Sequence, residues 1–217
     1  MQFLFKKKPK KLEERLTEMF RDVPTFETER LILTKITEKY TEDMFMYSSD
    51  PNVSRYLTWS PHLSRRETEN YIKLLGKKYG TGVFRDFGLV LKSTGRMIGT
   101  CGFTSVEDNT NTVEIGYVLA RDTWGNGYAA EAALFVTAFS FEILGADRVI
   151  AKMLEGNDAS LRVMKRLGML VEGVYRNAMF IKGEYKTVYT CGVDRRDFPK
   201  EYIETFYKNY DAKGRKF

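Results

Sequence analysis

The glycine-rich turn at residues 124–129, with the sequence WGNGYA, contains the residue types best suited to bind a charged ligand. The preceding segment 112–119 is β-branched and aromatic, which predicts a strand, and segment 129–144 is rich in Ala, Leu and Phe, which predicts a buried helix. Such a turn presents unpaired backbone N–H groups at the positive end of a helix dipole, where a phosphate can bind. Because glycine has no side chain, an anion can approach the backbone closely. The segment therefore predicts a phosphorylated ligand.

Two classes of ligand are consistent with this turn. Gly125, Gly127 and Ala130 match the dinucleotide-binding pattern G-x-G-x-x-G/A, which by itself is a weak indication. That pattern normally closes the first βα unit of its fold, whereas here its first glycine is residue 125. Glu155 follows the next apolar run, 149–154, and could bind a ribose, so a nicotinamide dinucleotide stays an alternative. The second candidate is acyl-coenzyme A.

Four motifs in sequence order favour acyl-coenzyme A. They are the segment TERLIL at 28–33, the glycine turn, the segment 157–169, and Glu172-Gly173 followed by the turn KGEY at 182–185. In this order and spacing they resemble the GNAT superfamily of N-acetyltransferases, and within it the RimJ/RimL-type branch that acetylates ribosomal-protein N-termini. The resemblance covers about residues 26–193 and implies transfer from acetyl-CoA to a primary amine by direct attack in a ternary complex.

Two positions depart from the superfamily pattern. Trp124 stands where the loop usually begins with Gln or Arg, although aromatic residues occur there in the RimJ/RimL-like branch. Met164 stands where many members carry a tyrosine that protonates the leaving thiolate, and methionine cannot donate a proton. A general acid must therefore come from elsewhere. The branch carries a serine near the sulfur, and Ser160 occupies that position, so Ser160 is the candidate for protonating or hydrogen-bonding the thiolate.

The resemblance also implies which residues contact the cofactor. Backbone N–H groups at the end of the strand would bind the pantetheine arm or the thioester carbonyl, and an asparagine would also bind the arm. The expected set is Tyr117, Val118, Leu119, Trp124, Gly125, Asn126, Gly127, Tyr128, Ala129, Ala130, Asn157 and Ser160. The alternative for Asn157 and for Ser160 is a purely structural role in capping the following helix.

The acceptor site is predicted from fewer signals. Glu114, on the strand before the turn, is the candidate general base, and its alternative is a structural glutamate paired with a cation. Trp59 and His62 lie in an aromatic, proline-containing loop that could form one wall, although Trp59 could be core and His62 structural. Tyr175 could form the opposite wall. A protein N-terminal α-amine is the expected acceptor, and a polyamine or an aminoglycoside is the alternative.

The elements that position these residues alternate in type along the chain. Helices are expected near 12–20, at 41–48, from the capping box Ser64–Glu67 to about 79, at 129–144 and at 159–167. Strands are expected at 25–36, 84–92, 97–106, 112–119 and 149–154, with a final hairpin turning at 182–183. Hairpins followed by βαβ units predict an α/β fold with a mixed, mostly antiparallel central sheet and helices on both faces.

Charge is distributed unevenly over the 217 residues. The net charge is +6, but residues 1–11 carry +5 and residues 208–217 carry +3, which leaves −2 for the remainder. We therefore expect a basic tail and short helix over 1–24, an acetyltransferase domain over 25–197, and a helix with a basic tail over 198–217. The basic ends either keep the protein in solution or contact a ribosome, RNA or another anionic surface.

Other features restrict the function further. The sequence shows neither a signal peptide nor a membrane span, which predicts a cytoplasmic protein without membrane contact. We expect a monomer or a homodimer. Cys101 and Cys191 are expected to be buried free thiols. With one histidine and no clustered ligands, no metal site is predicted. A non-catalytic coenzyme A-binding or RNA-binding module stays as the alternative of another class.

Overall fold

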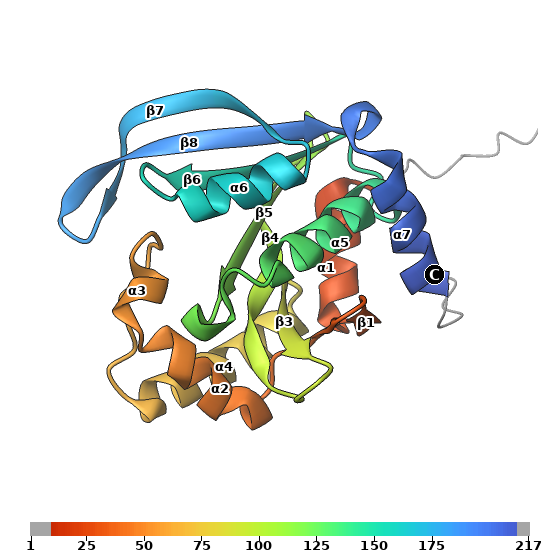
Figure 1. The fold of residues 1–217 in the computed structure, drawn as a ribbon. Coiled ribbons are helices and arrows are strands. Elements are labelled where there is room, and N and C mark those ends of the chain that lie inside the picture. Colours follow the sequence, from red (N-terminus) through yellow and green to blue (C-terminus); the bar gives the residue numbers. More distant parts are fainter. Residues whose placement is uncertain (1–9, 212–217) are drawn as a thin grey trace, which may run out of the picture.

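The computed structural model describes residues 10–211, which form one eight-stranded sheet with the order β1-β2-β3-β4-β5-β6-β8-β7 (Figure 1). β5 and β6 run parallel and the other neighbouring strands run antiparallel. The predicted fold class, an α/β fold with a mixed and mostly antiparallel sheet, is therefore confirmed. The lysines at positions 6, 7 and 8 lie outside the described residues.

The first half of the chain builds one side of the sheet and the helices over it. Its elements are α1 (Leu12–Arg21), β1 (Phe26–Glu27), β2 (Leu31–Thr34), α2 (Thr41–Ser48), α3 (Pro51–Ser54), α4 (Arg65–Gly80), β3 (Asp86–Leu91) and β4 (Met97–Glu107). The cap at Ser64 is confirmed, because the Glu67 N–H donates to Ser64 Oγ, whereas the Glu67 carboxylate accepts from the Leu63 N–H rather than from that of Ser64. The single strand expected over 25–36 is wrong: the Thr28 N–H donates to the Leu31 carbonyl, and this tight turn divides the segment into β1 and β2.

The second half supplies the parallel pair and a long terminal hairpin. Its elements are β5 (Thr112–Leu119), α5 (Tyr128–Glu142), β6 (Arg148–Leu154), α6 (Asp158–Arg166), β7 (Leu170–Ile181), β8 (Glu184–Asp194) and α7 (Lys200–Asp211). Short 3₁₀ turns lie at 38–40, 121–123 and 195–197. The predicted hairpin turn at 182–183 is confirmed. Lys182 and Gly183 have φ of +50° and +85°, and a two-residue type I′ turn requires positive φ at both positions.

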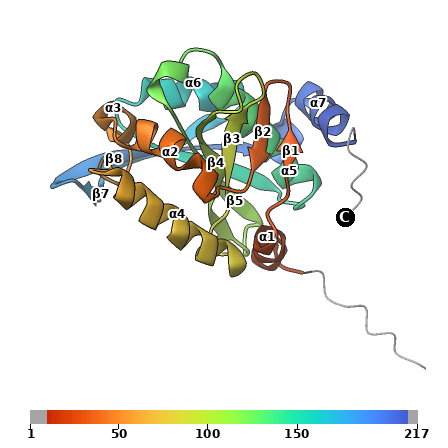
Figure 2. The ribbon, with the colours of Figure 1, turned by 90° about the horizontal axis from the view of Figure 1, so that it is seen from below.

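Helices cover both faces of the sheet, with α2 and α4 on one side and α5 and α7 on the other (Figure 2). α5 is buried on nearly all sides, which explains why its sequence is apolar all round rather than amphipathic. Leu12 of α1 and Phe206 of α7 belong to the same hydrophobic core as the sheet. The helices expected outside the 25–197 domain are therefore packed into it.

The parallel strands β5 and β6 separate partway along their length. Their pairing ends where Ile115 meets Ala151. β5 continues to Leu119 and pairs with β4, while β6 continues to Leu154 and pairs with β8. The opening between the two strand ends exposes the edge of β5 and leads to the first turns of α5 and α6. This separation positions the candidate site.

Candidate active site

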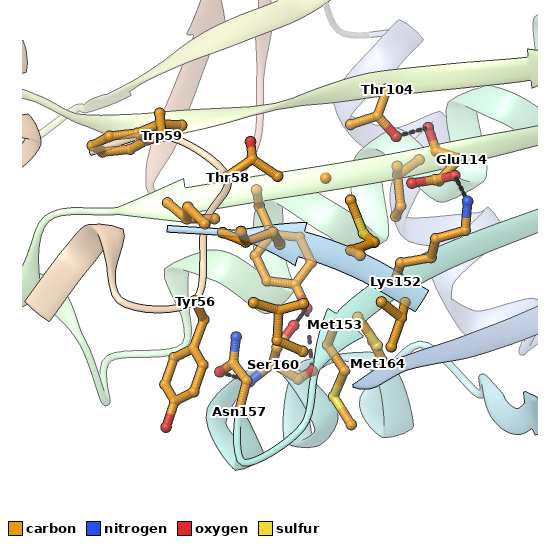
Figure 3. A pocket seen from close by; sticks show the side chains of 18 residues that line it. Tyr56, Thr58, Trp59, Thr104, Glu114, Lys152, Met153, Asn157, Ser160 and Met164 are labelled. Atoms are coloured by element: carbon orange, nitrogen blue, oxygen red, sulfur yellow. Dashed lines mark hydrogen bonds and ion pairs between the residues drawn. The ribbon is translucent and has the colours of Figure 1, made fainter. Parts of the chain in front are cut away.

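Two cavities meet at the opening between β5 and β6. One, of about 420 Å³, lies between the end of β5, the first turn of α5 and α6. The other, of about 320 Å³, lies between β5, β6, the loop after α3 and the terminal hairpin (Figure 3). Both cavities are lined by Tyr56, Leu57, Tyr117, Asn157 and Ser160. A ligand in the larger cavity can therefore present one end to a second molecule in the smaller one.

The glycine turn forms the far end of the larger cavity. Gly125 and Gly127 have φ of +80° and +79°, and Gly127 is the N-cap of α5. The first N–H groups of α5 precede its earliest i→i−4 hydrogen bond, from Glu131 to Gly127, so they can bind an anion. The expected residues that line this end are Trp124, Gly125, Gly127, Tyr128, Ala129 and Ala130. Asn126 does not line it, since its side chain donates to the carbonyls of Thr123 and Trp124.

An ion pair between Arg30 and Glu131 lies beside the turn and holds it in place. The Arg30 guanidinium donates to the Asn126 carbonyl at 2.9 Å and to Glu131 Oε2 at 2.6 Å, and it stacks over the Tyr128 ring. Thr28 Oγ1 donates to the same glutamate. Arg30 thus ties the turn and the first turn of α5 to the segment before β2. The sequence motif at 28–33 contains these residues, but nothing in the sequence alone revealed that they contact the turn.

Trp124 has a specific role at the position where the superfamily pattern has Gln or Arg. Its Nε1 donates to the Leu119 carbonyl at 2.9 Å, and its ring lies partly exposed beside the larger cavity. The indole therefore satisfies an acceptor at the end of β5 that β6 no longer covers. The departure from the pattern is compatible with a binding cleft.

The edge of β5 that faces the opening presents backbone N–H groups at alternate positions. The Ala120 N–H donates to the Ile98 carbonyl of β4 at 2.7 Å. Since bonding groups alternate along an antiparallel ladder, the Val118 N–H points to β4 as well, while those of Tyr117 and Leu119 point into the opening. Tyr117 and Leu119 are consequently the two positions whose backbone can bind a pantetheine amide or a thioester carbonyl.

Asn157 and Ser160 stand at the start of α6, at the wall that both cavities share. The Asn157 side-chain oxygen accepts from the Ser160 N–H at 3.2 Å, which makes Asn157 the N-cap of the helix. The structural role foreseen as its alternative is therefore present. It does not prevent ligand binding, because an asparagine side chain also carries an NH₂ donor.

The Ser160 hydroxyl faces a phenol from the opposite strand. Ser160 Oγ lies 2.9 Å from the Tyr117 hydroxyl, which also lies 3.1 Å from the Ser160 carbonyl oxygen. Burial raises the pKa of Tyr117 far above its ordinary value, so the phenol keeps its proton. Met164, buried one turn further along α6, also lines the smaller cavity. The side chain of Tyr117 thus adds a polar group that the sequence interpretation, limited to its backbone, did not include.

Glu114 points into the smaller cavity and forms an ion pair there. Its Oε2 accepts from Lys152 Nζ at 2.6 Å (Figure 3). The same oxygen accepts from Ser105 Oγ at 3.1 Å, and the glutamate side chain is only 14% exposed. Lys152 follows Ala151, the last residue of β6 that pairs with β5, and its side chain reaches across the start of the opening. Both contacts engage Oε2, so Oε1 is the oxygen that can accept a proton from an incoming amine. Lys152 was not among the site residues predicted from the sequence.

The predicted acceptor walls are realised in part. Trp59 lines the smaller cavity, whereas His62 and Tyr175 do not. His62 Nδ1 lies 3.0 Å from Ser48 Oγ and 2.7 Å from Thr68 Oγ1, and partial burial lowers the pKa of its ring. The Tyr175 ring lies over Gly173 and is 57% exposed. The residues of the terminal hairpin that line this cavity are Met179, Ile181 and Val188.

Within residues 10–211, no three His, Cys, Asp or Glu side chains come together to hold a metal ion, and no helix is long and apolar enough to cross a membrane. Cys101 and Cys191 are free and buried, as expected.

Comparisons with known proteins agree with this geometry. A family model described as an acetyltransferase (GNAT) domain matches residues 30–170. The uncharacterized N-acetyltransferase p20 of Bacillus licheniformis is 30% identical over 174 residues, which cover 80% of this chain and 98% of that protein. A GNAT-family acetyltransferase structure from Bacillus anthracis has a TM-score of 0.71 at 26% identity and covers 80% of this chain and 99% of its own. RimL, a ribosomal L7/L12 alpha-N-protein acetyltransferase solved with coenzyme A, has a TM-score of 0.66 at 19% identity over 79% of this chain and 98% of its own, which shows a common fold alone.

Proposed function

This chain belongs to the GNAT acetyltransferases, and from that premise we propose that its acceptor is the α-amino group of a protein N-terminus. An acetyl-CoA-dependent N-acetyltransferase needs a cleft for the cofactor and a second site for an amine, and the two joined cavities meet this need. The support for this acceptor comes from the lining of the smaller cavity, and in particular from the charge of that lining.

The smaller cavity suits one amine attached to an uncharged group. Its charged lining residues are Glu114 and Lys152, which neutralise each other. The rest of its lining is mainly apolar or aromatic, including Leu57, Trp59 and Met179. A polyamine or aminoglycoside brings several ammonium groups, each of which would need a carboxylate when desolvated. An α-amine has an ordinary pKa of about 7.7–8.0, so a substantial fraction is already neutral near pH 7.5.

We assign the following roles within a ternary complex. The pyrophosphate of acetyl-CoA binds the turn 125–130, and the pantetheine arm follows the free edge of β5 past Asn157. The N–H groups of Tyr117 and Leu119 are placed to bind the thioester carbonyl as charge develops on its oxygen. Glu114 Oε1 accepts the amine proton, directly or through water. Ser160 hydrogen-bonds the departing sulfur.

A panel of acceptors tests the proposal. Release of free thiol from acetyl-CoA would be measured with short peptides that carry a free N-terminus, with the same peptides acetylated at the N-terminus but retaining a lysine, with spermidine and with an aminoglycoside. We expect kcat/KM to be highest for the free N-terminal peptides and to fall at least tenfold when the N-terminus is blocked. A higher kcat/KM for spermidine or the aminoglycoside would refute the N-terminal assignment and favour a small-amine acetyltransferase.

A further inference from the structure

The hydroxyl groups of Tyr117 and Ser160 meet at the point where the thiolate must leave. Both residues line both cavities, and their oxygen atoms lie 2.9 Å apart. The amine arrives from the smaller cavity and the cofactor occupies the larger one, so the carbon–sulfur bond breaks at this shared wall. Met164, one turn along α6, lines the same region but has no proton to donate.

The proton inventory of the pair permits one productive arrangement. Each hydroxyl carries one hydrogen and can accept at its oxygen. When the Tyr117 phenol donates to Ser160 Oγ, the serine's own hydrogen is released from that contact and can point into the cavity. When the serine donates to the phenol instead, the phenol hydrogen can go to the Ser160 carbonyl at 3.1 Å, and neither hydrogen faces the sulfur.

We propose that Tyr117 is a positioning residue whose phenol donates to Ser160 Oγ and thereby directs the serine hydrogen at the departing sulfur. The inference rests on the proposed placement of the thioester beside Ser160. The amine nitrogen bonds to the acetyl carbon, the carbon–sulfur bond breaks, and the sulfur retains the electron pair. The proton lost by the nitrogen passes through Glu114 or water to the thiolate, so the overall proton balance is closed.

Neither hydroxyl loses its proton in this arrangement. Burial opposes ionisation of the phenol, because a buried phenolate would lack the solvation it has in water. The pair therefore supplies a hydrogen bond rather than a proton. A hydrogen bond to a charged group contributes more than one between neutral groups, and here the sulfur is charged only as it leaves.

A double-mutant cycle tests the coupling between the two hydroxyls. Tyr117→Phe removes the phenol oxygen and keeps the ring, Ser160→Ala removes the serine hydroxyl, and the double variant removes both. We expect each single variant to lower kcat about tenfold, with the KM for acetyl-CoA within about twofold of wild type. The double variant should be no slower than Ser160→Ala. Tyr40→Phe, which removes the phenol oxygen of a buried tyrosine that lines neither cavity, is the matched control and should leave kcat unchanged.

A binding measurement tests the same inference without an acceptor. Calorimetry would compare coenzyme A with desulfo-coenzyme A, which lacks the sulfur, at a pH where the thiol is partly ionised. The wild type should bind coenzyme A more tightly than the desulfo analogue, and Tyr117→Phe and Ser160→Ala should both lose that preference. Additive effects in the cycle, or an unchanged preference in Tyr117→Phe, would overturn the proposal. Since this measurement needs no amine, it stands even if N-terminal peptides prove not to be substrates.

Discussion

A carboxylate placed at Gly127 should weaken acetyl-CoA binding by repelling its pyrophosphate. The position is open, because a Cβ built there would meet Arg30 Nη2 at 3.6 Å and no closer heavy atom. Steric exclusion is therefore minor and the charge dominates. The residue is the N-cap of α5 with φ of +79°, a conformation that asparagine and aspartate adopt more readily than other non-glycine residues.

The magnitude follows from the geometry. Two unit charges about 5 Å apart interact by about 0.8 kcal/mol in bulk water and by about 3 kcal/mol at an effective dielectric constant of about 20. Arg30 would offset part of this repulsion, since its guanidinium lies within reach of the new carboxylate. We therefore expect Gly127→Asp to raise the Kd for acetyl-CoA at least tenfold, which corresponds to about 1.4 kcal/mol.

Gly127→Asn provides the matched control, because it has nearly the same shape and backbone preference without the charge. Calorimetric Kd values for acetyl-CoA would be compared between the two variants at low and high salt, with thermal unfolding as a check on folding. The difference between Asp and Asn should shrink as salt screens the repulsion. If the two variants bind within twofold of each other at low salt, the pyrophosphate does not lie on this turn.

Three further variants test other parts of the site and the core. Glu114→Gln should lower kcat roughly 10²–10⁴-fold with little change in the KM for acetyl-CoA, and a steady-state rate within threefold of wild type would mean that the amine arrives neutral and needs no base. Glu131→Gln should weaken the ion pair with Arg30 and raise the KM for acetyl-CoA several-fold at constant kcat. An equal fall in kcat would show that this ion pair also orders the acetyl end of the cofactor. Thr137 Oγ1 is buried without a hydrogen-bond partner in the described part of the chain, so Thr137→Val should raise the free energy of unfolding by about 1 kcal/mol, and a loss of stability in urea would contradict this.

Local chemistry made most of the elements predictable. The cap at Ser64, the turn at Lys182-Gly183 and the glycine turn before α5 each depend on residues adjacent in sequence. The division of segment 25–36 was missed because its turn is closed by Thr28, a residue that also fits a strand. Alternation of apolar residues alone does not show where a strand is interrupted.

The geometry of the site depends on contacts that sequence spacing does not encode. Pairing of Lys152 with Glu114 requires the register of two strands separated by a helix, and it requires that their pairing end at Ile115. The opening itself reflects the course of β6 toward β8 rather than any motif in β5. His62 was a candidate because of its residue type, yet its Nδ1 contacts the hydroxyl groups of Ser48 and Thr68 and the residue does not line the smaller cavity.

Position 164 carries no tyrosine, and the hydroxyl groups beside the cleft come from Ser160 and Tyr117 instead. Residues four apart lie on one face of a helix, so Ser160 and Met164 both face the cleft from α6, one turn apart. The methionine fills apolar volume beneath the cleft, and the polar contact moves toward the helix N-terminus. There the serine is within reach of β5, and Tyr117 supplies the phenol from the strand instead of the helix. The phenol of Tyr117 is held at two points: its backbone pairs with β4, and its hydroxyl contacts α6. Tyr117 thus combines a backbone N–H that can bind the thioester carbonyl with a phenol that contacts Ser160, the residue proposed to face the sulfur.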